Sequence, residues 1–429
     1  MIDIYSIKKN TTKPSHFSQF NPRASNLFTI PDKKDHSWQR RCLGTAFSDA
    51  NLKQFEEKLL VHAGNLCDEI GSWQAWGDGE WSLPLNMSHL IGYCVFDVLT
   101  DFVMSRNFDL LRSSKHRPII YHIKEHILRP AVCVYAPLLA VLKVDKLLFK
   151  NATQSTKEFW KWVKSAITNR IQHGEGLQDM FTRIQLSRQS EGSPALGIQS
   201  ETGMFLVAGL DTTTTALCSL LFYLSRNQSV YERLCSEVRE TFENKDQIRS
   251  GEQLRSCVFL QACIDEALRM SPPAASPPWR EVGVGGEVIA GQVIPQGCHV
   301  GTGTYSLHHH EAHFLNPHVY NPDRWFSGPP MSSGRIQTPA FIPFSIGSRS
   351  CIGRTLAYSE ISLIVVYLLW KYDFRASSGR DRNLGGGEEM EGMERVGRAN
   401  PGEFQVIDRV VGLQDGPVLE FRVRNITRE

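Results

Sequence analysis

The stretch FIPFSIGSRSCIG (residues 341–353) sets Cys351 in a short, glycine-rich loop that also carries an arginine. It leads into ISLIVVYLLW (361–370), an apolar run that we interpret as part of a core helix. A thiol that only fills space in a core needs no such setting. A thiolate just before a helix is stabilised by the helix dipole and by unpaired N–H groups. We therefore predict that Cys351 is a metal ligand.

The composition excludes several classes of protein. The chain has 429 residues, of which 41% are hydrophobic and 21% are charged, as in ordinary globular proteins. A net charge of +2 gives no electrostatic argument for nucleic acid. The ten cysteines form no CxxC pairs, so a disulfide framework and a zinc ribbon both fit poorly. Neither a signal peptide nor a membrane-spanning apolar run is apparent, which indicates an intracellular chain without a transmembrane anchor.

Helical periodicity dominates about 36–270 and returns at 353–372, whereas about 274–305 and 403–424 favour strands with glycine-bearing turns. This pattern predicts a mainly α fold with small β-sheets. Residues 1–35, most of 311–350 and the segment GGGEEMEGMERVG (385–397) are expected to be loops. The expected helices include 48–73, 85–112, 119–146, 151–190, 200–225, 229–243 and 253–270.

The loop around Cys351 has the residue types that a haem needs. Gly347 and Gly353 allow the backbone to approach a flat ligand, Phe344 can shield the sulfur, and Arg349 can meet a carboxylate. No histidine base lies in the loop, so an axial haem thiolate fits better than a nucleophile. The pattern resembles the haem-binding signature of the cytochrome P-450 family, in the spacing Phe344-x-x-Gly347-x-Arg349-x-Cys351-x-Gly353-x-x-x-Ala357.

The resemblance extends over the whole chain and is nearest to fungal class II enzymes of secondary metabolism. It implies one cytochrome P-450 domain over 1–429, with haem b held through iron by Cys351. It implies a monooxygenase that inserts one oxygen atom from O2 into a C–H bond of a small lipophilic substrate. Electrons would come from NADPH through a flavoprotein reductase, NADPH-cytochrome reductase. We further expect a monomer without a nucleic-acid partner, in a family usually found at the endoplasmic reticulum membrane.

Three charged residues resemble the family's Glu-Arg-Arg cluster. Glu266 and Arg269, in CIDEALR, share a helix face at i and i+3, and alone they would be an ordinary helix pair. Arg324, in NPDRW, completes the set in the expected order. The resemblance gives this cluster a structural role, holding the loop before the cysteine through charge-assisted hydrogen bonds.

The long helix carries AGLDTTTT, in which Ala208 and Thr212 share a face. Gly209 and the row of hydroxyls weaken a helix, and such local inconsistency is typical of functional sites. The alternative is a threonine-rich core helix. The resemblance assigns Asp211 and Thr212 as a proton-relaying acid–alcohol pair above the iron, and gives Gly209 the role of leaving room for O2.

Haem propionates need cations. His36 and Arg40, in HSWQRR, match the family's propionate-binding helix, and Arg280 and Arg349 match two further propionate arginines. Taken singly, each is also an ordinary solvated side chain. The basic face Lys33, Lys34, Arg40 and Arg41 is of the kind that docks the acidic surface of a reductase.

The substrate pocket is expected to draw on the 1–35 loop, the 105–150 segment, Ala208 and the turn near Val411. Three small residues that follow the Glu-Arg pair should join them: Ala274, Ala275 and Ser276.

The tract LHHHEAHF invites a metal interpretation that its spacing does not support. It lacks the His-Glu-x-x-His arrangement, so we do not predict a metal site formed by His308, His309, His310 and His313.

Compared with the family pattern, the chain shows no membrane helix, first helix or opening strands before residue 1, which predicts exposed sheet edges. Two alternatives therefore stay open. One is a truncated, inactive haem-protein remnant. The other is an O2-independent haem-thiolate isomerase or dehydratase, against which the Asp211–Thr212 pair argues.

Overall fold

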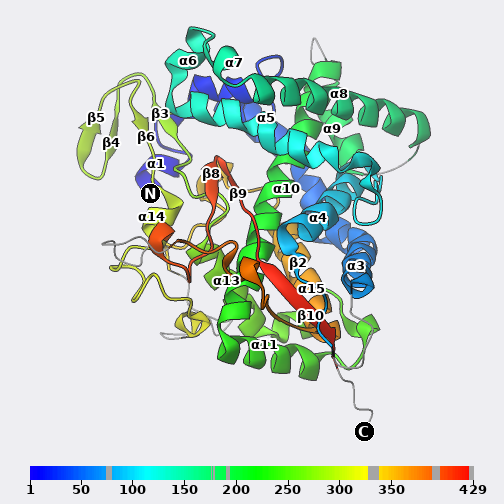
Figure 1. Ribbon diagram of the computed structural model, residues 1–429. Helices are drawn as coiled ribbons and strands as arrows, with labels where there is room; N and C mark the ends of the chain where they lie inside the picture. The colour runs from blue at the N-terminus through cyan, green and yellow to red at the C-terminus, as the bar shows by residue number, and fades with distance from the viewer. Residues whose placement is uncertain are drawn as a thin grey trace.

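One long helix, α10 (Pro194–Arg226), runs through the middle of the molecule (Figure 1). It packs against α4 (Met87–Met104), α13 (Val258–Met270) and α15 (Arg354–Lys371). Because α10 is apolar on most of its faces, it can be buried along most of its length. A shared hydrophobic core extends from Leu27 to Phe421.

The computed structural model describes residues 1–73, 80–174, 176, 179–189, 194–326, 338–388 and 397–424. Part of the expected loop 385–397 lies outside these residues. The fold is mostly helical with small antiparallel sheets, as predicted. The remaining helices are α1 (Ile2–Tyr5), α2 (Lys33–Gly44), α3 (Asp49–Ser72), α5 (Pro118–Tyr135), α6 (Pro137–Val141), α7 (Asp145–Leu148), α8 (Lys150–His173), α9 (Met180–Arg188), α11 (Gln228–Thr241), α12 (Glu252–Ser256) and α14 (Thr304–His308).

The described strands form four small sheets. Their orders are β1-β3-β6, β2-β10-β7, β4-β5 and β8-β9. The strands are β1 (Thr11–Thr12), β2 (Leu85–Asn86), β3 (Arg280–Val282), β4 (Glu287–Ile289), β5 (Gln292–Ile294), β6 (His299–Val300), β7 (Tyr372–Ala376), β8 (Ile407–Arg409), β9 (Val411–Leu413) and β10 (Val418–Val423).

Three of the long helices predicted from periodicity are interrupted. The segment 85–112 is helical only as far as α4, because Ser105 adopts a left-handed conformation with φ 49°. The segment 119–146 divides into α5, α6 and α7, with Pro137 starting the second of these. The segment 151–190 divides into α8 and α9. A left-handed residue, Ser105, a proline, Pro137, and the side-chain cap that Asp179 gives to α9 mark these boundaries where the apolar pattern ran on.

Residues 1–35 are more ordered than the sequence predicted. They contain α1, β1 and a 3-10 helix at Ser15–Phe20. β1 pairs with β3, which pairs on its other side with β6, so β3 is the central strand of this sheet and β1 and β6 are its edges. The buried carboxylate of Glu201 on α10 accepts a hydrogen bond from the N–H of Leu27 at 3.0 Å and pairs with Arg188. The N-terminal segment is thereby anchored over the core.

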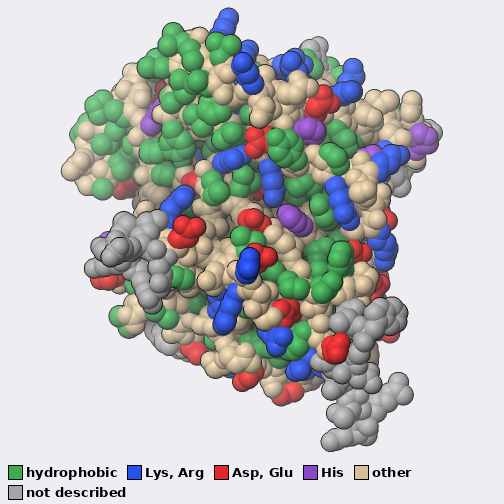
Figure 2. Space-filling view, in the orientation of Figure 1, with side chains coloured by type: hydrophobic (Ala, Val, Ile, Leu, Met, Phe, Trp, Pro, Cys, Tyr) green, Lys and Arg blue, Asp and Glu red, His purple; other side chains and the backbone are tan. Residues whose placement is uncertain are grey.

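One part of the surface is strongly apolar. Large hydrophobic side chains stand exposed on α6 and α7 and on the β4–β5 hairpin, at the top and left of the molecule (Figure 2). By length and composition, α4 and α10 are the described helices that could cross a membrane. Their most apolar windows are 83% and 78% buried in the fold, as expected of core helices. The exposed set is Leu138, Val141, Leu142, Leu147, Leu148, Val284, Val288 and Val293.

Candidate active site

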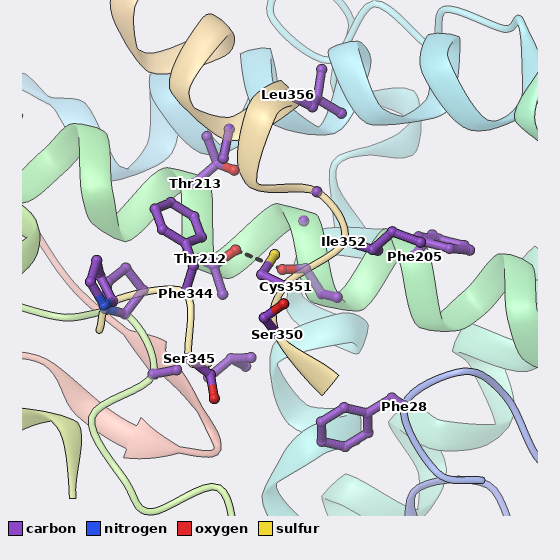
Figure 3. A pocket seen from close by; sticks show the side chains of 18 of the residues that line it. Phe28, Phe205, Thr212, Thr213, Phe344, Ser345, Ser350, Cys351, Ile352 and Leu356 are labelled. Atoms are coloured by element: carbon purple, nitrogen blue, oxygen red, sulfur yellow. Dashed lines mark hydrogen bonds between the residues drawn. The ribbon is translucent and has the colours of Figure 1, made fainter. Parts of the chain in front are cut away.

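A cavity of about 340 Å³ lies between α10 and the loop that carries Cys351 (Figure 3). Cys351 lines one wall, and Ala208, Gly209 and Thr212 of α10 line another. The thiol is exposed inside this cavity, although most of the wall around it is apolar. The sulfur and the long helix thus meet in one space, as the sequence predicted.

Backbone geometry holds the cysteine loop. The N–H of Cys351 donates to the carbonyl oxygen of Phe344 at 2.9 Å. Gly347 has φ +78°, and a Cβ there would lie 2.2 Å from the carbonyl oxygen of Tyr5. The close approach that requires this glycine is therefore to α1, whereas the sequence suggested a flat ligand. A Cβ at Gly353 would meet only ordinary contacts, 3.7 Å from Phe47 and 3.9 Å from the sulfur.

The electrostatics of Cys351 differ from the expectation. Burial raises the pKa of its thiol, and the N–H of Gly353 and the charges of Arg40 and Arg354 only partly oppose that effect. The polypeptide alone therefore favours the neutral thiol. A bound metal cation reverses this preference, because a coordinating thiol loses its proton outright.

Four basic side chains line the cavity and form what we call the cationic cluster: Lys13, Arg40, Arg280 and Arg349. Among the residues that the structure describes, none of the four has a carboxylate within 4.0 Å. Each donates instead to backbone carbonyl oxygens, as Lys13 does to Phe28 at 2.6 Å and Arg40 to Ser350 at 2.7 Å. Buried charges without partners are costly, so the cluster is suited to an anion from outside the chain.

Because these cations lie close together and are partly buried, the pKa values of the cluster and of His36 are shifted. Burial and the neighbouring arginines lower the pKa of Lys13 well below its usual range and that of Arg349 to about 10. Burial, followed by the charges of Arg349 and Arg40, lowers the pKa of His36 to about 3. His36 lines the cavity as predicted, but it is a neutral hydrogen-bonding group there and not the cation that we expected.

The only carboxyl group among the described lining residues does not compensate the cluster. Glu360 is 1% exposed, and burial raises its pKa to about 8, so it is neutral at pH 7. The residues present therefore fit haem: a sulfur for the iron, apolar walls for the porphyrin and unpaired cations for two propionates. Lys13 was missed from the sequence, because nothing in a loop-like N-terminal segment marks one lysine as buried.

The α10 wall has the predicted face. The hydroxyl of Thr212 donates to the carbonyl oxygen of Ala208 at 2.7 Å (Figure 3). Gly209 also lines the cavity, but a Cβ there would lie 2.5 Å from Cδ2 of Leu99. The tight contact at this glycine is thus with α4, whereas the resemblance gave Gly209 the role of leaving room for O2.

Asp211 lies beside this wall and does not line the cavity. It is fully buried, and neither carboxyl oxygen has a hydrogen-bond partner among the described residues. Burial raises its pKa to about 7, against the opposing charges of Lys124 on α5 and Arg409 on β8. The predicted acid–alcohol pair is therefore divided, with the alcohol facing the cavity and the acid inside the protein.

The structure brings Glu266, Arg269 and Arg324 together in the interior. Arg269 holds both carboxylate oxygens of Glu266 at 2.9 and 3.0 Å, and Arg324 donates to the same carboxylate at 2.8 Å. Arg269 also donates to the carbonyl oxygen of His308 at 2.9 Å. Nε2 of His308 accepts the N–H of Ile342 at 2.9 Å, which links this cluster to the start of the cysteine loop.

The pocket predictions are mixed. Ala208, Ala274, Ser276 and Val411 line the cavity, whereas Ala275 does not and uses its carbonyl oxygen to accept the N–H of Tyr305. The segment 105–150 contributes no lining residue, although Tyr135 bonds to the hydroxyl of Ser276. The 1–35 loop contributes lining residues as expected, among them Phe28. The sequence missed the apolar residues Phe47, Leu99, Phe102, Val103, Met204 and Phe205, because an apolar helix face looks the same against a cavity as against a core.

This fold and site define a class, a helical protein with a haem pocket built around a cysteine. Comparisons with known proteins agree. Residues 3–386 match the family described as "Cytochrome P450". Among solved structures, "Crystal structure of cytochrome P450DA heme domain" has a TM-score of 0.71 at 18% identity, covering 97% of this chain and 84% of that one. The chain belongs to the cytochrome P-450 family of oxidoreductases.

Its relatives include fungal monooxygenases. "Cytochrome P450 monooxygenase poxM" of Penicillium oxalicum is 36% identical over 98% of this chain and 79% of its own length. A "Cytochrome P450 monooxygenase" of Gibberella zeae is 34% identical, over 99% of this chain and 97% of its own length. "Cytochrome P450 monooxygenase AKT7" of Alternaria alternata is 34% identical over 98% of this chain and 81% of its own length.

Replacing Lys13 with Met should weaken haem retention, because one buried cation for a propionate is lost. The loss of one charge-assisted hydrogen bond predicts haem release about tenfold faster. Transfer of haem to an excess of a haem-scavenging protein, followed by absorbance, measures that rate. The exposed Lys34→Met is the matched control, and equal rates in both variants would contradict the role of Lys13.

Replacing Asp211 with Asn should change how stability depends on pH. The folded-state pKa of about 7 lies above the usual 3.8, so the contribution to stability is complete below about pH 4 and is lost as pH rises through 7. Asn cannot ionise, so the variant should gain about 2–4 kcal/mol relative to the parent between pH 4.5 and 8. Thermal unfolding midpoints across this range test the trend, with the exposed Asp68→Asn as control. A constant difference between parent and variant would disprove it.

Proposed function

We propose that this chain is a haem-thiolate monooxygenase that inserts one oxygen atom from O2 into a C–H bond of a small lipophilic substrate in fungal secondary metabolism. One observation carries the proposal. Cys351 and the Ala208–Thr212 turn line the same cavity, together with four cations that have no carboxylate partner among the described residues. The fungal monooxygenases to which the chain is similar support the same activity.

Haem bound in this cavity supplies the activation of O2 and the transfer of oxygen to carbon. The chain's own residues do the rest. Cys351 would hold the iron through its thiolate, and the cationic cluster would hold the propionates and so orient the porphyrin. The apolar walls would exclude water and give a lipophilic substrate its binding energy.

Proton supply falls to Thr212 and Asp211. The Thr212 hydroxyl now donates to Ala208, and a small rotation would let it hand that proton into the cavity. Asp211, with a pKa of about 7, can both hold and release a proton near neutral pH. Since Asp211 is buried beside Thr212 and faces Lys124 and Arg409, it would replenish the hydroxyl from the protein side.

The Thr212–Asp211 pair helps to distinguish the monooxygenase from the O2-independent enzyme, and other features distinguish it from the inactive remnant. An isomerase or dehydratase that uses no O2 needs no proton relay beside the iron, so the Thr212–Asp211 arrangement favours the monooxygenase. The inactive remnant is disfavoured by the complete set of haem-holding groups and by the partner strand that β1 gives to β3.

Electrons would come from NADPH through a flavoprotein reductase, as is general in the family. Lys34 and Arg41 are exposed on α2 and could meet its acidic surface, whereas Arg40, which we also placed on this face, turns inward to Ser350. We expect a monomer of one domain, located at the endoplasmic reticulum membrane. Its exposed apolar patch on α6, α7 and the β4–β5 hairpin is compatible with that location.

The direct test of the haem site is the visible spectrum of the reduced, CO-bound protein. The parent should show the Soret maximum typical of a thiolate ligand, because Cys351 supplies the sulfur. Cys351→Ala should lose that spectrum, and Cys42→Ala, at a cysteine away from the cavity, should keep it. A thiolate spectrum that survives in Cys351→Ala would overturn the proposal.

Replacing Thr212 with Val should uncouple turnover, because the cavity loses its proton-bearing hydroxyl. Product formed per NADPH consumed, with reductase and an accepted substrate, should fall about tenfold or more, in line with the loss of a general acid. Thr214→Val is a matched control, because its hydroxyl also donates to a carbonyl one turn back at 2.7 Å but does not line the cavity. Full coupling in Thr212→Val would refute the relay.

A further inference from the structure

A second group of chemically active side chains lies away from the cavity. His309 and His318 lie in the loop that follows α14, and Glu403 lies in the loop before β8. None of the three lines the haem cavity. One ligand-type atom from each residue lies within 4.8 Å of the other two: Nε2 or Nδ1 of each histidine and a carboxylate oxygen of Glu403.

The free atoms of this group point to a missing ligand. Nε2 of His309, Nδ1 of His318 and Oε2 of Glu403 are buried, and none has a hydrogen-bond partner in the described part of the chain. Glu403 is only 2% exposed, so its unbonded oxygen is costly. The closest charged approach is 3.6 Å, from Nδ1 of His318 to Oε2 of Glu403, too long for a hydrogen bond. Three orphaned atoms in one place are unusual in a folded protein.

Neighbouring groups orient the ligands. Nδ1 of His309 lies 3.0 Å from the carbonyl oxygen of Tyr305. A carbonyl can only accept, so Nδ1 carries the proton and Nε2 keeps its lone pair for a metal. The hydroxyl of Tyr305 donates to Oε1 of Glu403, and its ring stacks on His309 with centroids 3.9 Å apart. Supporting hydrogen bonds of this kind set the tautomer and ring orientation of metal ligands.

We propose that His309, His318 and Glu403 form a binding site for a divalent metal ion of the zinc class. Two nitrogens and one carboxylate oxygen suit Zn²⁺, whereas Mg²⁺ and Ca²⁺ prefer sites built from oxygen alone. Ligands about 2.0–2.2 Å from a tetrahedral zinc ion lie about 3.3 Å from each other. The His318–Glu403 distance is already close to this value, and modest side-chain rotation brings in His309.

The other histidines of the tract HHHEAH are not part of the proposed site. His310 and His313 are exposed, and His308 is engaged with Ile342. Only His309 of the tract joins the site, with His318 from the same loop and Glu403 from a distant part of the sequence.

The position of the site suggests what the metal does. His309 and His318 directly follow His308 and Pro317, whose carbonyl oxygens both accept hydrogen bonds from Arg269. A metal would tie both ends of this loop to Glu403, in a separate loop near the C-terminus. Since the loop also holds the cysteine segment through His308, the metal stabilises the fold beneath the haem site and takes no part in the reaction.

The test uses purified, haem-loaded protein that has been treated with a chelator and freed of it. Calorimetric titration with ZnCl2 should show one tight site per chain. Glu403→Gln and His318→Gln should each weaken it at least about 100-fold, since they remove a direct ligand. The double variant His310→Gln/His313→Gln is the matched control and should bind zinc as the parent does. Saturating zinc should raise the thermal midpoint of parent and control but not of the site variants.

Two results would overturn the proposal. One is zinc binding of equal affinity in the parent and both site variants, or no tight site in the parent. The other is a zinc X-ray absorption spectrum with sulfur ligands, which would place the ion on a cysteine such as the exposed Cys298. The reduced CO spectrum checks that each variant is folded. If the ligand variants fail this check, Tyr305→Phe, which removes only the supporting hydroxyl, should weaken zinc binding about tenfold, and unchanged binding would count against the site.

Discussion

Positively charged side chains that have no carboxylate partner among the described residues are the constraint on which the haem pocket depends. Lys13, Arg40, Arg280 and Arg349 converge on one cavity whose only described carboxyl group is the neutral Glu360, and backbone carbonyls satisfy these cations only in part. A fold that accepts this cost is suited to an anion from outside its described residues. The same charges keep His36 neutral and lower the pKa of Lys13, so the electrostatics of the pocket belong to the cluster as a whole.

The cysteine loop has no regular structure of its own beyond one short 3-10 turn, so its position comes from its neighbours. Arg349 fastens it to the N-terminal segment through the carbonyl oxygens of Ile30 and Pro31, at 2.7 and 2.8 Å. Arg269, through His308, fastens its other end at Ile342. The first link runs from an arginine directly to backbone carbonyls, whereas the second also needs the imidazole of His308, which accepts the N–H of Ile342. These hydrogen bonds, together with α15, which follows the loop directly, set the position of the sulfur.

The sequence predicted whatever depends on spacing along the chain. The signature around Cys351, the i and i+3 pair Glu266–Arg269 and the Ala208–Thr212 face are local patterns, and the structure brings each of them together. The burial of Lys13 and the direction in which Asp211 points are different, because tertiary contacts decide them. The reason for Gly209 was likewise invisible, since Leu99 lies on another helix.

Buried polar and charged atoms that lack a complementary partner among the described residues connect these findings. Such atoms are rare in folded proteins because each one costs free energy, so their distribution carries information about what the protein binds. Three settings bear on what this protein binds: cations beside a flat cavity that have no carboxylate partner among the described residues, a lone acid behind the helix that faces the cavity, and two imidazoles with a carboxylate between loops. An anion, a mobile proton and a metal cation are the respective complements. The anion and the mobile proton act at the haem site. The metal site lies behind the loop that supports the haem site, so metal binding can change the stability of the pocket without touching its chemistry.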